Sequence, residues 1–152
     1  MRSFFLLACI SSIVWLAGCG SSPPVNTVSK AELSCANAKQ RLSQLVPAVN
    51  KAERTKDVQL MKTTLTTAAV IVQDARREIA ALSNPPQAYL AKLGLLAAAY
   101  QQAAQAAGND NEAALSLSLR KAQKAQLQAA RQARLAGLKV CGKPISGHTS
   151  HP

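Results

Sequence analysis

The segment AELSCANAKQRLSQLVPAVNKA, residues 31–52, carries the pattern that decides the fold. Small and apolar residues recur in it at alternating steps of four and three, which places them on one side of an α-helix. These positions are Ala31, Cys35, Ala38, Leu42, Leu45, Val49 and Ala52. Just before them, SKAE (residues 29–32) has the form of a capping box, in which Ser29 and Glu32 satisfy the first N–H groups. We expect Pro47 to kink this helix rather than end it, because the pattern continues beyond the proline.

The same spacing returns three more times along the chain. The expected N-caps are Asp57 for the second helix and Asp110 for the fourth. Gly108 is expected to end the third helix and Gly137 the fourth. The three stripes are Val58, Met61, Leu65, Ala68, Val72, Ala75, Ile79 and Leu82; Tyr89, Leu93, Leu96, Tyr100, Ala103 and Ala107; and Leu115, Leu119, Ala122, Gln126, Ala129, Ala133 and Ala136. Helices of similar length with short connections predict an all-α, up-down-up-down four-helix bundle over residues 29–141.

The N-terminus has the features of an export signal. Arg2 precedes an apolar run over residues 4–17, which is too short for the roughly 20 residues of a membrane span. The run ends in Leu16-Ala17-Gly18-Cys19, which resembles the lipobox of bacterial lipoproteins. The resemblance implies that residues 1–18 are removed and that Cys19 carries diacylglycerol, often with a further acyl chain such as palmitate. The alternative is a soluble secreted protein whose cleavage site happens to contain cysteine.

This resemblance also implies a location. The protein would be lipid-anchored to a bacterial membrane and would face the periplasm or the cell exterior. Gly20 replaces the aspartate that favours inner-membrane retention in Gram-negative lipoproteins, so the outer membrane is the expected site in such a cell. Residues 19–28, rich in Ser and Pro, are expected to be a short flexible tether that keeps the domain close to its membrane.

The four cysteines divide into three roles. Cys9 leaves with the signal and Cys19 takes the lipid, so Cys35 and Cys141 remain, in a compartment that permits disulfides. We expect these two to pair, because an up-down-up-down bundle brings the start of its first helix and the end of its last to the same end. A three-helix bundle would separate them. The alternative is two free buried thiols, and two distant cysteines are too few for a metal site.

The sequence offers no constellation for catalysis. The carboxylate pairs Glu53/Asp57 and Asp74/Glu78 are each four residues apart, but capping and solvated surface charge explain them better than acid–base or metal chemistry. The histidines, His148 and His151, fall in the tail 142–152, where we expect disorder and no metal. An alanine-lined core also predicts little room for a haem or flavin. We therefore expect a non-enzyme without cofactor.

Charge is the strongest remaining feature. The chain has a net charge of +11, and loss of Arg2 leaves 17 basic and seven acidic residues, or +10. Helical spacing predicts one basic row, interrupted by Leu127 and made of Arg120, Lys124, Arg131 and Arg134. Lys139 and Lys143 are expected near the tethered end, within reach of anionic headgroups. The row suits an anionic membrane, an envelope polymer or a partner helix, and its simpler interpretation is a solvated face.

Two tyrosines, both on the predicted inner stripe, cannot supply the stacking platforms of a single-strand nucleic-acid binder, so no nucleic-acid partner is expected. Small alanine-rich helical lipoproteins of bacterial envelopes are similar in composition. The leading hypothesis is a non-catalytic envelope lipoprotein acting through protein or anionic-surface contacts. An inhibitor, immunity or exclusion lipoprotein that binds a secreted effector or envelope protein is the alternative, and a metal-handling protein using the histidine tail is a third.

Overall fold

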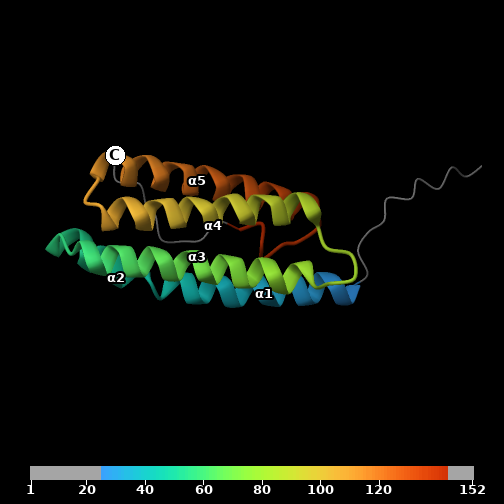
Figure 1. Cartoon of the computed structure of the whole chain (residues 1–152). Coiled ribbons are helices and arrows are strands. Elements are labelled where there is room, and N and C mark those ends of the chain that lie inside the picture. Colours follow the sequence, from blue (N-terminus) through green and yellow to red (C-terminus); the bar gives the residue numbers. More distant parts are fainter. Residues whose placement is uncertain (1–24, 144–152) are drawn as a thin grey trace, which may run out of the picture.

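The computed structural model describes residues 25–143, and these residues form an all-α fold. The helices are α1 (Val25–Ser43), α2 (Val46–Thr55), α3 (Val58–Ala80), α4 (Gln87–Gly108) and α5 (Glu112–Leu135). Figure 1 shows α1 and α2 end to end as one arm beside α3, while α4 and α5 form a second layer. The chain reverses direction after α2, α3 and α4. The predicted up-down-up-down bundle of four arms is confirmed, with its first arm in two pieces.

The first arm differs from the prediction at Pro47. α1 ends at Ser43 and α2 begins at Val46, with Pro47 in its first turn, so the helix stops and restarts instead of bending. The reason is that a first-turn residue needs no intrahelical N–H donor, which makes this the position where proline costs least. The two helices still continue in one direction, and both pack against α3.

The start of α1 also differs from the prediction. The helix begins at Val25, so the expected capping box at residues 29–32 lies inside it and cannot cap its end. Thr27 is buried and Val28 packs against the core, which gives the earlier turn a tertiary reason to form. Residues 25–28 therefore belong to the bundle, and only residues 19–24 of the predicted tether fall outside the described part of the chain.

Three residues set the starts of α3 and α5, at the end of the bundle opposite the start of α1. Asp57 is the N-cap of α3 as predicted, and its Oδ1 accepts from Leu60 N–H at 2.9 Å. The predicted cap of α5, Asp110, is wrong by one residue, because Asn111 Oδ1 accepts from Ala114 N–H at 2.9 Å. Asp110 instead adopts a left-handed conformation with φ of 52°, which turns the chain between α4 and α5.

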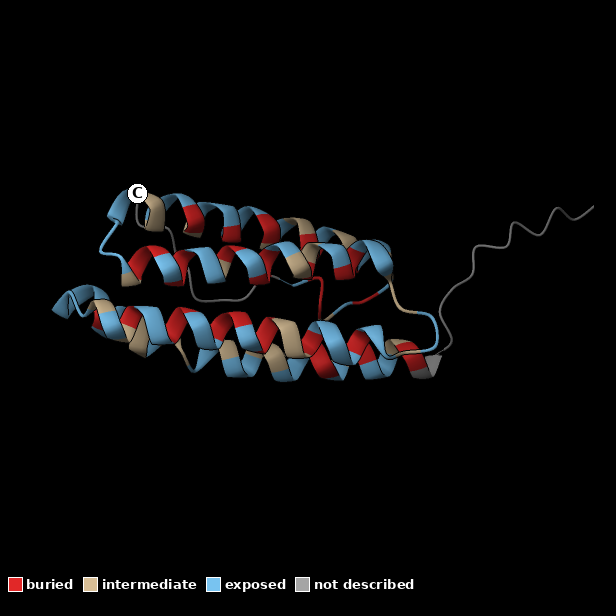
Figure 2. Ribbon diagram, viewed as in Figure 1, coloured by how far each residue is buried: buried red, intermediate tan, exposed pale blue. Residues whose placement is uncertain are grey.

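The predicted stripes form the core. Figure 2 shows buried residues on the inward sides of the arms and exposed ones outside. α3 and α4 contribute the larger aliphatic side chains, such as Ile79 and Leu96, whereas the inward side of α5 is mostly alanine. Such small side chains let α5 lie close against α4. The main interfaces join α1 and α2 to α3, α3 to α4, and α4 to α5, and no comparable helix–helix interface within residues 25–143 joins the first arm to α5.

Residues 136–143, called the C-terminal hook from here on, connect those two outer arms. Gly137 has a φ of 76° and reverses the chain, and Leu138 N–H donates to Ala133 O at 2.9 Å. Gly142 then lies against the backbone of Ala130, so the hook runs back beside the helix that it has just left. The predicted disulfide is confirmed: Cys141 of the hook is bonded to Cys35 of α1, with a Cα–Cα distance of 5.3 Å.

Side chains of α1 hold the backbone of the hook around this disulfide. The Glu32 carboxylate accepts hydrogen bonds from the N–H groups of Lys139, Val140 (2.8 Å) and Cys141 (3.1 Å). The Lys39 ammonium donates to the carbonyls of Val140 and Lys143. These bonds satisfy backbone groups that have no helical partner. Glu32 thus acts as a latch on a segment more than 100 residues away in sequence, not as a helix cap.

The latch can be tested by Glu32→Gln, which keeps the side-chain shape but turns an NH₂ group or a weaker acceptor toward the three N–H donors. Hydrogen bonds to charged groups contribute about 1.5–3 kcal/mol each, so we expect the free energy of unfolding to fall by about 2–3 kcal/mol in urea denaturation of the oxidised protein. Glu53→Gln, at an exposed side chain of α2, is the matched control and should cost less than about 0.5 kcal/mol. Equal losses in the two variants would contradict the latch.

Candidate functional site

The disulfide lies in a buried polar cluster. Cys35 and Cys141 are both buried, and the Tyr89 hydroxyl donates to Cys35 Sγ at 3.2 Å, because a disulfide sulfur carries no hydrogen. Burial raises the pKa of Tyr89, and the negative charge of Glu32 raises it further. Burial lowers the pKa of Lys39, an effect that Glu32 opposes and Lys143 reinforces. The cluster therefore stabilises the closure of the bundle, and its cysteines are held as a bridge rather than as free thiols.

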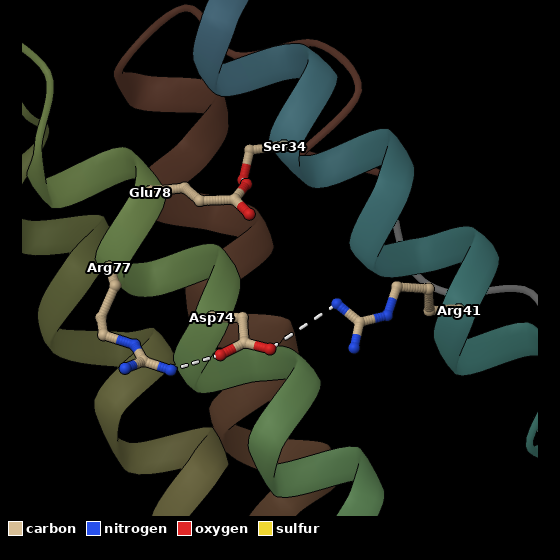
Figure 3. A network of polar contacts seen from close by, with 5 residues as sticks. All are labelled: Ser34, Arg41, Asp74, Arg77 and Glu78. Carbon is tan, nitrogen blue, oxygen red and sulfur yellow. Dashed lines mark hydrogen bonds and ion pairs between the residues drawn. The ribbon is translucent and has the colours of Figure 1, made fainter.

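The paired carboxylates have separate structural partners. Asp74 Oδ1 accepts from Arg77 at 2.5 Å, and Asp74 Oδ2 lies 3.7 Å from the Arg41 guanidinium of α1. Figure 3 shows that Glu78, one turn along, points instead toward Ser34, whose hydroxyl donates to it at 2.6 Å. These contacts tie α1 to α3. The sequence predicted capping and solvated surface charge for this pair; the structure instead uses both carboxylates in contacts between helices.

The other pair divides in the same way, because Asp57 caps α3 while Glu53 is an exposed residue of α2. Across residues 25–143, no three His, Cys, Asp or Glu side chains gather closely enough to hold a metal ion. His148 and His151 lie outside the described residues, so the metal-handling hypothesis stays untested at its own residues.

The predicted basic row lies on the exposed side of α5. Three leucines of this helix are also more than half exposed, at 51%, 59% and 73% for Leu117, Leu127 and Leu135. We call this surface the cationic face; its basic members are Arg120, Lys124, Arg131 and Arg134. No acidic residue follows Glu112 in the sequence, so nothing later in the chain neutralises the face. Lys139 and Lys143 extend the exposed positive charge onto the hook.

Arg134 differs from the rest of the row, because its guanidinium also donates to the carbonyl of Gly142 at 2.7 Å. It therefore helps to hold the hook. The other cations of the row, Arg120, Lys124 and Arg131, make no ion pair with a residue of the described chain. These three, like the exposed Lys121 of the same helix, remain available to an anionic partner.

A cavity of about 240 Å³ lies between the first arm and α5. Its walls are mainly aliphatic and come from all four arms, with Leu45, Val49, Leu65, Ala122 and Leu127 among them. A smaller cavity of about 50 Å³ adjoins it on the side of the hook, where Cys141 and Lys143 contribute to the lining. Leu42 and Gln126 line both, so the two spaces lie in one gap between the outer arms.

The alanine-lined core, which was expected to leave little room for a haem or flavin, still contains this apolar space. Short side chains close the gap between α4 and α5, which pack directly. Between α5 and the first arm, which share no comparable interface within residues 25–143, such short side chains leave a gap along part of the length. The hook fills this gap only at the disulfide end. Gln126 was the available signal in the sequence, because a glutamine on an otherwise alanine-rich inner stripe indicates a position where the core is not closed.

None of the described helices is both long and apolar enough to cross a membrane. Comparison of the chain with protein-family models, with curated proteins and with solved structures gives no match. The exposed surfaces and the cavity are therefore the features that bear on function.

The two tyrosines provide a pH test of the core. Burial raises the pKa of Tyr100, as it does that of Tyr89, above the value near 10 of an unfolded chain. Their contribution to stability is present below about pH 10 and is lost as the pH rises from there toward the folded-state pKa values, because only the unfolded chain then releases its protons. We expect the phenolate absorbance of the native mature protein to appear at a clearly higher pH than in urea.

Lys39 has the opposite sign, since its lowered pKa makes deprotonation favour the folded state as the pH rises. The tyrosine contribution is therefore measured by comparing how the free energy of unfolding changes with pH in the wild type and in the Tyr89→Phe and Tyr100→Phe variants. The stability of the variants should fall less steeply above pH 10. Identical titration of the tyrosines in native and urea-unfolded protein would show that they are not buried.

Proposed function

We propose that the chain is a lipoprotein of the bacterial cell envelope, anchored through Cys19, that acts by binding rather than by catalysis. The lipobox Leu16-Ala17-Gly18-Cys19 supports the anchor. The observation that carries the binding role is the cationic face of α5, where exposed cations and leucines lie together. Leucine side chains enter the boundary between headgroups and acyl chains, while each Lys or Arg near an anionic surface contributes about 1 kcal/mol. We infer that the partner of this face is an anionic membrane or envelope polymer.

The short distance between lipid and bundle supports the same orientation. Six chain steps lead from Cys19 to Val25, the first residue of α1, and they span at most about 20 Å when extended. In Figure 1 the start of α1 lies at the end of the bundle where α5 ends and the hook begins. An anchor at Cys19 would therefore hold Lys139 and Lys143 near the headgroups, and the cationic face would continue from them.

The anchor is tested by expressing the full chain in bacteria and measuring the mass of the mature protein. We expect a product that begins at Cys19 and carries diacylglycerol, and we expect Cys19→Ser to abolish lipid attachment. Cys9→Ser, which removes a cysteine of the signal, is the matched control and should leave the lipid in place. A Cys19→Ser protein that still carries lipid, or a wild-type protein without it, would contradict the anchor.

The cationic face is tested with the unlipidated mature chain carrying Cys19→Ser, by co-sedimentation with vesicles. Binding should need anionic lipid and should weaken about 100-fold in Arg120→Gln/Lys124→Gln/Arg131→Gln, since three cations near the surface contribute about 3 kcal/mol. The control, Lys51→Gln/Arg54→Gln/Lys62→Gln, removes the same charge from exposed positions on α2 and α3.

Equal losses in the two triple variants would show that only net charge matters. Vesicle binding that does not depend on the fraction of anionic lipid would contradict the proposal that the cationic face binds an anionic membrane.

A further inference from the structure

The larger cavity lies beside the cationic face, and these two features together indicate a ligand. Leu127 belongs to both, because it lines the cavity and interrupts the basic row. On the opposite wall, Leu45 and Val46 lie where α1 gives way to α2. The cavity thus opens between a broken arm and a positively charged helix.

The size and lining of the cavity fit an aliphatic chain. If a methylene group takes roughly the 30 Å³ that a water molecule takes in the liquid, the cavity of about 240 Å³ holds about eight of them. Leu65 and Met61 of α3 form its floor, and the walls are mainly aliphatic. An α-helix, about 10 Å across with its side chains, would be too wide unless the arms moved apart.

The polar groups at the cavity are mostly neutral hydrogen-bond donors. Tyr100, Gln123 and Gln126 line it, and none of their side chains is hydrogen-bonded to another residue within the described range. A hydroxyl and two amides can all donate to a group that only accepts, and an ionised carboxylate is such a group. The same groups can also accept, so a carboxylate is one headgroup that satisfies them, and the surrounding charge decides between a carboxylate and a cationic headgroup.

The charge around the opening favours an anion as well. Arg120, Lys124 and Arg131 do not line the cavity, but helical spacing places them next to Gln123 and Leu127, which do. Glu53 is the one ionised residue lining the larger cavity, on the α2 side, and is exposed. The cations on α5 outnumber it, so the local field attracts an anionic headgroup, while Glu53 weakens that attraction.

We propose that this cavity binds a single-chain fatty acid, with its carboxylate at the α5 side and its aliphatic chain between α5 and the first arm. The apolar part of the site is distinct from the membrane contact proposed above, with which the site shares Leu127 and the cations of α5, and it does not need the lipid on Cys19. A second copy of the chain fits it less well, because the surface beside the opening carries like charges that repel each other.

The test is calorimetric titration of the mature Cys19→Ser protein with dodecanoate at pH 8 and low ionic strength. We expect dodecanoate to bind at least tenfold more tightly than hexanoate, which has too short a chain to fill the cavity. We also expect it to bind at least tenfold more tightly than dodecyltrimethylammonium, which has the same chain and the opposite charge. Equal affinities in either comparison would overturn the proposal.

Two variants narrow the cavity from different walls. Ala122→Leu extends into it from α5, and Val49→Phe from α2. Either change should weaken dodecanoate binding at least tenfold, and the second keeps the test valid if the first disturbs the core. Ala98→Leu, the control, adds the same side chain as the first variant at an exposed position of α4 outside the cavity. Unchanged binding in both folded cavity variants would overturn the proposal.

Variants that change the charge near the cavity test whether the bound headgroup is negative. Glu53→Gln should strengthen dodecanoate binding, whereas Arg120→Gln/Arg131→Gln should weaken it. Vesicle co-sedimentation distinguishes this site from the proposed membrane contact. Ala122→Leu should weaken dodecanoate binding but leave vesicle binding unchanged. Sedimentation completes the test: a dimer that Ala122→Leu abolishes would assign the cavity to a second copy of the chain and overturn the fatty-acid proposal.

Discussion

The closure between α1 and the C-terminal hook is the constraint on which the rest of the structure depends. The first arm and α5 lie at opposite ends of the chain and share no helix–helix interface within residues 25–143 comparable to the others. The Cys35–Cys141 bridge and the Glu32 latch hold them together. In the chain-entropy model, a disulfide that closes a loop of about 100 residues contributes about 4.7 kcal/mol. The latch complements this by satisfying the backbone of the hook, which a disulfide alone cannot do.

This closure acts at one end only. The bundle is sealed near the hook, contains the larger cavity farther along, and has a second apolar cluster toward the other end, which Val49, Ala52 and Leu115 join. At the hook, Leu138 and Cys141 fill the space between the outer arms. Beyond Leu42 and Gln126 the larger cavity remains between these arms. The same helix that borders this cavity carries the exposed cations. One helix, α5, thus supplies both a charged outer surface and one wall of an apolar space.

Sequence patterns predicted what depends on neighbouring residues. The three-four spacing located the buried side of every arm, and the topology that it implied brought Cys35 and Cys141 together. What it missed depends on contacts across the fold. Glu32 looked like a capping residue because its true partners, the N–H groups of the hook, lie more than 100 residues away. Asp110 and Asn111 are both good caps, and only the turn geometry decides between them. The cavity depends on which arms pack, and that is not encoded in any one stripe.

The most direct test is an amide NMR spectrum recorded during addition of dodecanoate, because it separates the closed hook from a cavity that admits a ligand. The account predicts that shifts concentrate at residues around the larger cavity, including Leu45, Val49, Leu119 and Gln123, while the amides of the hook and of the disulfide change little. Shifts spread over the outer surfaces of α3 and α4, or centred on the hook, would contradict it.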